Sequence, residues 1–205
     1  MNKNNYNTDK LAQDFDRVAP LFNLIRPLFS RSYRRAAEYT LAGLKDRQKP
    51  PRVLDIGTGT GTLAGIFDQK GARVTGIDIS PGMLRQARKK YSQVNFIQAP
   101  AHSLEEMEDN SFEVVSAAFV IHEMPPDYRL NLFKQMQRVA REAVLIIDYV
   151  PNNNPLIALV ENMEKSYYRE FLESVDRQLD QIFPTHVRKK LWHFIGMYLC
   201  PLRKV

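Results

Sequence analysis

The sequence of 205 residues contains a single cysteine, Cys200. One cysteine cannot form an internal disulfide bond, and it excludes a zinc site built from several cysteine ligands. Long apolar runs are also missing, because charge or proline interrupts them well before the roughly 18 residues that a transmembrane helix needs. The N-terminus, MNKNNYNTDK, lacks the apolar core of a signal peptide. We therefore expect a cytoplasmic protein with no metal site and no transmembrane segment.

No long run of one charge occurs, although the formal net charge is +6. The basic residues form three short clusters, which are Arg31, Arg34 and Arg35; Arg85, Arg88, Lys89 and Lys90; and Arg188, Lys189 and Lys190. The first two clusters have the spacing of the solvated face of an amphipathic helix. Such dispersed charge favours ordinary solvated surfaces, so we do not expect a nucleic-acid partner.

The central motif is VLDIGTGTG at residues 53–61. An aliphatic run followed by three alternating glycines predicts a strand that ends in a tight turn, where the main chain can approach a ligand. The TLAGIF segment that follows offers a helix N-terminus with unpaired N–H groups. The motif therefore predicts a loop that binds a nucleotide-type ligand. Its candidate binding residues are Asp55, Gly57, Thr58, Gly59 and Gly61.

Two other nucleotide loops fit this motif less well. No G-x-x-x-x-G-K-[ST] sequence occurs, which excludes a P-loop. The dinucleotide pattern G-x-G-x-x-G/A fits only when it is counted from Gly59 to Ala64, and this register leaves Asp55 and Gly57 unexplained. The carboxylate of Asp55 would repel a pyrophosphate at close range, whereas it suits a cationic or amino-bearing ligand. A nicotinamide-dependent (NAD) dehydrogenase nevertheless stays open as an alternative.

From residue 52 onward, apolar strands and helices alternate, which is typical of a parallel sheet with right-handed crossovers. The expected strands cover residues 52–56, 73–78, 94–98, 112–118 and 143–149. The expected helices cover residues 8–25, 30–44, 61–69, 82–91, 127–140 and 155–175. Ligands bind such sheets at the carboxyl ends of the strands. Asp78 ends the second strand and could accept hydrogen bonds from both hydroxyls of a ribose.

Several motifs together resemble the class I S-adenosylmethionine (SAM) dependent methyltransferases, in particular the small-molecule type related to ubiquinone and menaquinone biosynthesis. They are the D-x-G-x-G-x-G loop, GIDISPGML, EDNSFEVVSAAFVIHEMPP, FDRVAPLFNLI and SYYREFLE. The resemblance implies a Rossmann-like α/β fold with a seven-stranded mixed sheet, mostly parallel with one antiparallel strand. Helices would cover both faces, and residues 185–192 and 194–200 would form the last two strands. The chain would be one domain, with a helical cap at 1–48, a SAM-binding core at 50–150 and an acceptor-side segment at 151–205.

The resemblance also implies roles for single residues. Those that match the family's SAM contacts are Asp55, Gly57, Thr58, Gly59 and Gly61 for the methionine part, Asp78 for the ribose, Ile79, Met83 and Ala101 for the adenine, and Phe119 beside them. Core packing stays open for Met83. The chain departs from the family's Gly-Asp-Ala pattern at Pro100, which has no side-chain acceptor for the adenine amino group. We expect this loss to weaken binding about tenfold at most, since one hydrogen bond contributes about 0.5–1.5 kcal/mol.

His122 is the candidate catalytic residue. An unperturbed imidazole could take a proton from a hydroxyl or an acidic carbon near pH 7. Methyl transfer needs mainly alignment and exclusion of water, so a structural role for His122 stays open. Phe15, Phe22 and Tyr33 would either pack in the core or line the acceptor pocket, and residues 155–175 would complete that pocket. The aromatic and aliphatic residues predict a small hydrophobic or aromatic methyl acceptor, such as a quinol or a phenol.

Motifs for methylating nucleic-acid bases are missing. The chain has no Asp/Asn-Pro-Pro-Tyr/Phe tetrad and no Pro-Cys nucleophile, so base methylation is disfavoured. An RNA or DNA methyltransferase and a non-catalytic SAM-binding module nevertheless stay open beside the dehydrogenase.

Overall fold

The computed structural model describes residues 12, 13, 16, 29–44, 49–151, 167–183 and 185–202. Most of the helix expected at residues 8–25 lies outside these residues, as do Phe15, Phe22 and the first part of the helix expected at 155–175. The sections below concern the described residues alone.

A seven-stranded sheet forms the centre of the molecule, with the strand order β3-β2-β1-β4-β5-β7-β6. The strands are β1 Arg52–Ile56, β2 Arg73–Asp78, β3 Asn95–Gln98, β4 Phe112–Ala118, β5 Ala140–Tyr149, β6 Val187–Lys190 and β7 Ile195–Pro201. Strand β7 runs antiparallel to both β5 and β6, whereas the remaining pairs are parallel. The predicted mixed sheet with one antiparallel strand is therefore confirmed.

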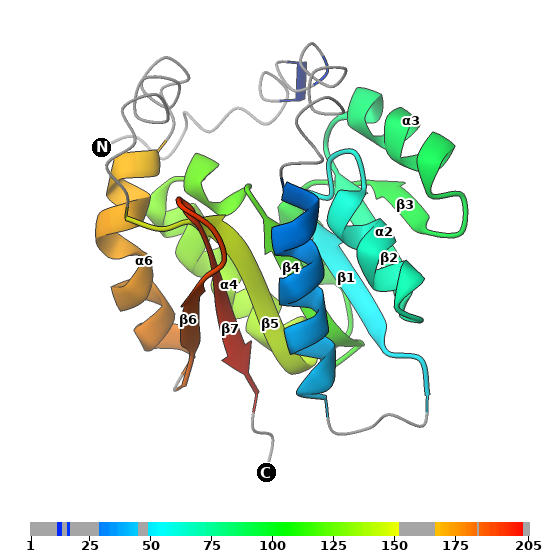
Figure 1. The fold of residues 1–205 in the computed structure, drawn as a ribbon. Coiled ribbons are helices and arrows are strands. Elements are labelled where there is room, and N and C mark those ends of the chain that lie inside the picture. The colour runs from blue at the N-terminus through cyan, green and yellow to red at the C-terminus, as the bar shows by residue number, and fades with distance from the viewer. Residues whose placement is uncertain are drawn as a thin grey trace.

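Helices cover both faces of the sheet (Figure 1). They are α2 Thr62–Gln69, α3 Pro81–Lys90, α4 Pro126–Val139 and α6 Tyr168–Ile182, with short 3₁₀ helices η1 Ala101–Glu106 and η2 Ile121–Glu123. Residues 29–42 are also helical. This 29–42 helix packs with α2 and α3 on one face, and α4 and α6 pack on the other. Two apolar cores result, one on each side of the sheet.

The inner strands are apolar on both sides because both of their faces are covered. In β5, residues 143–148 are all buried, and β1 is buried after its first residue. The four residues of β6 are all exposed, since this strand forms one edge of the sheet. The sheet thus has a well-packed centre and one polar edge at β6.

The acceptor-side helix differs from its expected position. Helix α6 begins at Tyr168 and continues to Ile182, seven residues beyond the predicted end at residue 175. Its apolar positions Phe171, Val175 and Leu179 recur at helical spacing and are buried against the core. The amphipathic pattern therefore carries the helix further than the SYYREFLE motif suggested. Among the described residues, no helix has the length and apolar character that crossing a membrane would need.

Candidate active site

The glycine loop follows β1 and adopts the left-handed backbone conformation that its glycines permit. Gly57, Gly59 and Gly61 have φ angles of 61°, 54° and 75°. A Cβ atom on Gly57 would lie 2.7 Å from Cγ2 of Val120, so this glycine lets the loop after β4 pack closely. A Cβ on Gly59 would meet no protein atom within 4 Å. Gly59 therefore presents bare main chain to open space, as a ligand-binding turn requires.

Asp55 holds this loop in place through hydrogen bonds to its side chain. Its side chain is buried, and its two oxygens accept hydrogen bonds from Thr58 Oγ1 and Ser116 Oγ, each at 2.7 Å. Burial raises the pKa of this carboxyl to about 6, although the bonds from Thr58 and Ser116 and the backbone N–H of Ala64 oppose the rise. Asp55 thus ties the turn to β4 and to the start of α2. Its contact with the amino group of SAM stays a prediction.

Asp78 lies at the end of β2, beside Gly59. Its Oδ2 accepts a hydrogen bond from the backbone N–H of Gly59 at 2.7 Å, and its Oδ1 accepts one from the N–H of Ser80 at 2.8 Å. Burial raises the pKa of Asp78, and the backbone bonds oppose that shift. A carboxylate can accept about four hydrogen bonds. Two acceptor positions thus remain for a pair of vicinal hydroxyls, so the residue fits the ribose of SAM.

The start of α3 borders the same site. Ser80 is the N-cap, and its hydroxyl accepts a hydrogen bond from the N–H of Met83 at 3.0 Å. Asp16 accepts bonds from the Ser80 hydroxyl and, at 2.8 Å, from the N–H of Gly82. The side chain of Met83 is buried. Asp16 was missed by the sequence reasoning, which considered only the aromatic residues of its FDRVAPLFNLI motif.

The two remaining adenine candidates flank this helix start. Ile79 follows Asp78 directly, and its carbonyl accepts a bond from Gln98 Nε2 at 3.3 Å. Ala101 begins η1, just after Pro100, and is partly buried. Both therefore lie at strand ends on the cofactor side, next to Asp78 or the end of β3. Their contacts with adenine stay predictions.

Phe119 belongs to an aromatic cluster at the end of β4. Its φ angle is 52°, which is uncommon for a residue with a bulky side chain. Its ring centroid lies 5.1 Å from Phe29, 5.1 Å from Tyr149 and 6.4 Å from Tyr33. Such strain is typical of functional sites, where surrounding contacts hold it in place. The ring packs against Phe29 and Tyr33 of the 29–42 helix and against the apolar core on that side of the sheet.

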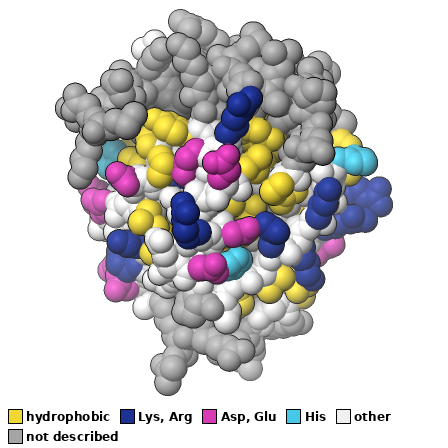
Figure 2. All heavy atoms as spheres, turned by 90° about the vertical axis from the view of Figure 1, so that its left-hand side faces the viewer, with side chains coloured by type: hydrophobic (Ala, Val, Ile, Leu, Met, Phe, Trp, Pro, Cys, Tyr) yellow, Lys and Arg dark blue, Asp and Glu magenta, His cyan; other side chains and the backbone are white. Residues whose placement is uncertain are grey.

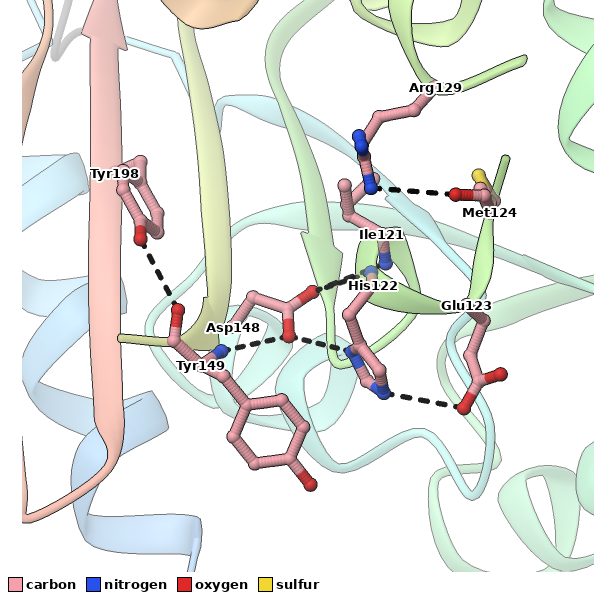
Figure 3. A network of polar contacts seen from close by, with 8 residues as sticks. All are labelled: Ile121, His122, Glu123, Met124, Arg129, Asp148, Tyr149 and Tyr198. Carbon is pink, nitrogen blue, oxygen red and sulfur yellow. Dashed lines mark hydrogen bonds and ion pairs between the residues drawn. The ribbon is translucent and has the colours of Figure 1, made fainter. Parts of the chain in front are cut away.

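His122 is held between two carboxylates (Figure 3). Nδ1 lies 2.7 Å from Oδ1 of Asp148, and Nε2 lies 3.3 Å from Oε1 of Glu123. Burial by itself would lower the pKa of His122, but Asp148 and Glu123 outweigh it and raise the pKa well above its ordinary value of 6.5. The raised pKa favours an imidazolium, which would donate from both nitrogens. The role of His122 as a general base stays a prediction.

Asp148 organises this part of the site from the end of β5. Its oxygens also accept bonds from the backbone N–H groups of Ile121, His122 and Tyr149, at 3.2, 3.3 and 2.8 Å. The side chain is fully buried. Asp148 thereby fixes both the η2 backbone and the imidazolium. The sequence reasoning missed it, although an acidic residue ending an otherwise apolar strand is a usable signal.

Arg129 joins this region to the acceptor-side helix. It is fully buried on α4, donates to Gln178 Oε1 at 2.6 Å and to Ser174 Oγ at 3.1 Å, and also pairs with Glu170. Its Nη1 contacts the carbonyl of Met124, directly after η2, at 3.4 Å (Figure 3). One buried guanidinium thus fixes α6 relative to the loop that carries His122. Nothing in the local sequence around Arg129 indicated this role.

Comparisons with known proteins identify the family of this chain. Residues 53–143 match a family model described as a methyltransferase domain. A demethylmenaquinone methyltransferase from Chlorobaculum tepidum is 32% identical over 169 residues, covering 78% of this chain and 67% of that protein. The chain belongs to the class I SAM-dependent methyltransferases. Members of this family use SAM as the methyl donor. That residues 53–61 bind it stays a prediction.

Another relative and a solved structure with the same fold are named for different acceptors. A phosphatidylethanolamine N-methyltransferase from Cereibacter sphaeroides is 31% identical over 152 residues, covering 63% of this chain and 72% of that protein. The SAH-bound magnesium protoporphyrin IX methyltransferase (ChlM) of Synechocystis PCC 6803, where SAH is S-adenosylhomocysteine, has the same fold. It aligns with a TM-score of 0.66 and 16% identity, covering 86% of this chain and 84% of that one. The chain spans about half to two thirds of the length of the demethylmenaquinone methyltransferases that it matches.

Proposed function

We propose that this methyltransferase transfers the methyl group of SAM to a small hydrophobic or aromatic acceptor. The observation that carries the proposal is the placement of Gly59 and Asp78 beside the aromatic cluster around Phe119. A cofactor-binding turn and a ring-lined surface lie next to each other at the carboxyl end of the sheet, because Gly57 allows the loop after β4 to pack against the glycine loop.

The residues at the glycine loop fit the donor. Bare main chain at Gly59 can approach the methionine part, and Asp78 has acceptor capacity for the ribose hydroxyls. When bound, SAM supplies an electrophilic methyl group on a sulfonium. The buried carboxylates of Asp55 and Asp78 place negative charge at the glycine loop, which favours a cationic ligand. These features support SAM as the ligand and disfavour a pyrophosphate-bearing dinucleotide.

The aromatic cluster supports the acceptor class. Tyr149 lies at its centre, with ring centroids at 4.8 Å from His122, 5.0 Å from Tyr168 and 5.1 Å from Phe119. Edge-to-face rings of this kind offer flat apolar surfaces to another ring. The relatives named for demethylmenaquinone and for phosphatidylethanolamine both have acceptors with large apolar parts. We propose a quinol-like or phenol-like acceptor for this chain.

His122 and Glu123 would together handle the proton that the methyl acceptor releases. Methyl transfer to an O–H or C–H acceptor breaks the S–CH₃ bond and forms the new methyl bond, and the acceptor releases a proton. Because His122 donates from both nitrogens, the group beside it that can accept this proton is the Glu123 carboxylate, whose side chain is 13% exposed. We propose that the imidazolium holds this carboxylate in place and stabilises negative charge that develops on the acceptor.

Calorimetric titration with SAH tests the donor site. We expect SAH to bind, and we expect Asp78→Ala to weaken its binding by at least about 100-fold, since it removes acceptors worth about 1.5–3 kcal/mol each. Asp68→Ala on α2 is the matched control, and it should leave the affinity unchanged. Binding of NAD in place of SAH would refute the proposal.

Turnover is then measured with SAM and a panel of hydroquinones, phenols and phosphatidylethanolamine. SAH binding with no methyl transfer to any of them would indicate a non-catalytic SAM-binding module.

A further inference from the structure

Two basic clusters that are far apart in the sequence meet on one surface. Lys189 Nζ on β6 lies 3.5 Å from the ring centroid of Tyr39 on the 29–42 helix. Arg31 and Arg35 precede Tyr39 at intervals of four residues, so these three side chains lie on one stripe of the helix. All of them are exposed. The stripe and the edge strand therefore form one continuous cationic surface.

The turn between β6 and β7 adds an aromatic residue to this surface. Trp192 is 39% exposed and lies three residues after Lys189. We call the surface formed by Arg31, Arg35, Tyr39, Lys189 and Trp192 the basic rim. In Figure 2, Lys and Arg side chains gather at the right-hand edge, which corresponds to the front of Figure 1, where the 29–42 helix lies. The neighbouring face over α6 instead mixes acidic and basic side chains, and Arg188 there pairs with Asp176.

Exposed apolar side chains concentrate on the same side of the molecule. Across the described part of the chain, the large hydrophobic residues that are exposed are Tyr39, Ile97, Tyr167, Val187 and Trp192. Only Ile97 lies on the opposite edge of the sheet, on β3. The other four belong to the basic rim, to β6 or to the residue before α6. On β6 and in the basic rim, the apolar side chains of Tyr39, Val187 and Trp192 therefore lie among cationic ones.

A chain of aromatic contacts connects the basic rim with the candidate acceptor site. The ring of Trp192 lies 5.3 Å from Phe194, and Phe194 lies 6.1 Å from Tyr149. Tyr149 in turn lies 4.8 Å from His122. The backbone N–H of Val150 donates to the carbonyl of Phe194 at 3.0 Å, which fixes the turn against the end of β5. The exposed tryptophan is thus two ring contacts away from the centre of the aromatic cluster.

We propose that the basic rim docks the enzyme on an anionic lipid bilayer. Lys and Arg attract an anionic bilayer surface, each by about 1 kcal/mol near the surface, and can place their apolar stems along the headgroups. Tyr and Trp favour the headgroup region because one end of each ring system is polar. Trp192 would enter the interface beside the acceptor site. The proposed bilayer contact does not depend on the proposed function. Delivery of a lipid-soluble acceptor through that contact rests on the proposed function.

Two simpler accounts explain only part of this surface. Charged residues protect an edge strand from pairing with another chain, which accounts for Lys189 and Lys190 but not for an exposed tryptophan at the turn. A nucleic acid would also be attracted by the charge, but the exposed apolar residues Val187 and Trp192 offer its phosphates nothing. A bilayer interface uses both the cationic and the apolar side chains.

Trp192 is the only tryptophan in the sequence, so its fluorescence reports on this turn directly. The protein is titrated with vesicles of phosphatidylcholine, with or without phosphatidylglycerol. We expect the emission to shift to shorter wavelength with the anionic vesicles only, and lipids with brominated acyl chains to quench it. An unchanged emission spectrum with anionic vesicles would overturn the proposal, as would a response to duplex DNA or single-stranded RNA without one to vesicles.

Charge reversal separates docking from edge protection. Arg35→Glu combined with Lys189→Glu keeps the edge strand charged, but it should lower partitioning onto anionic vesicles by at least about 25-fold, taking about fivefold for each basic residue. Lys89→Glu combined with Lys90→Glu changes the charge equally at the end of α3, on the other edge of the sheet, and should have little effect. An equal loss in both variants would show attraction by net charge alone and refute a specific rim. SAH titration of each variant reports on the donor site separately.

Discussion

The two halves of the candidate active site are built in different ways. On the cofactor side, many polar contacts join residues that are close in the sequence, such as Asp55 with Thr58, and Ser80 with Asp78 and Met83. On the acceptor side, His122 pairs with Asp148 across 26 residues and Arg129 pairs with Gln178 across 49 residues. The cofactor side is a local motif completed by a few distant contacts. The acceptor side exists only after α4, β5 and α6 have packed together.

The halves also differ in the kind of interaction that holds them. Carboxylates that accept backbone and hydroxyl hydrogen bonds fix the glycine loop, whereas buried charges fix the acceptor side. Removing one member of a buried ion pair leaves an uncompensated charge, so it costs more than removing one neutral hydrogen bond. Substitutions on the acceptor side should therefore reduce stability most, and those at the glycine loop should mainly reduce binding of SAH.

The largest effect is expected at His122. His122→Asn should lower the free energy of unfolding by about 4 kcal/mol near pH 6, because the buried Asp148 loses its counter-ion. The folded-state pKa of His122 lies above the ordinary value of 6.5. Its contribution is thus fully present below about pH 6.5 and is lost as the pH rises through the raised pKa. Urea unfolding of both proteins from pH 6 to pH 10 should show the difference shrinking.

The control for this prediction is His186→Asn. His186 lies 3.5 Å from Asp180, whose side chain is 71% exposed. Because water screens this pair, its loss should change stability by less than about 1 kcal/mol. A difference between wild type and His122→Asn that stays constant across the pH range would contradict an imidazolium at His122.

A somewhat smaller effect is expected at Arg129. Arg129→Ala should lower the free energy of unfolding by about 3 kcal/mol, since it removes a buried guanidinium that joins α4 to α6. Arg129→Lys keeps the charge but loses the forked geometry, and it should recover only part of the stability. Urea unfolding measures both, and SAH titration of the folded variants should give the wild-type affinity. A large loss of SAH affinity would show that the two halves are coupled more tightly than their contacts indicate.

The smallest of the three effects tests the glycine loop. Gly59→Ala should weaken SAH binding roughly 30-fold, or about 2 kcal/mol, because its Cβ would enter the space open to the ligand. Gly71→Ala is the matched control, since Gly71 also has a positive φ angle, 86°, and no atom within 4 Å of an added Cβ. Both variants should lose about 1–2 kcal/mol of stability from backbone strain. Equal SAH affinity in both would place the ligand away from Gly59.

The sequence by itself determined the fold class and the local geometry of the glycine loop and the start of α3. Glycines with positive φ, a serine N-cap before Pro81 and an aspartate at the end of a strand are local features whose conformation follows from residue type. The strands of the predicted core agree with the observed ones to within three residues at each end. Each of these features was visible because its partners are close in the chain or its backbone geometry has a strong residue preference.

Only the tertiary structure decided the chemistry of His122 and the composition of the basic rim. The protonation of a histidine depends on the charges around it, and Asp148 reaches it only because β4 and β5 are parallel neighbours in the sheet. Likewise, residues 31–39 and 189–192 share a surface because β6 forms the sheet edge beside the 29–42 helix. Long-range packing brings these side chains together, and no local sequence preference encodes such a meeting.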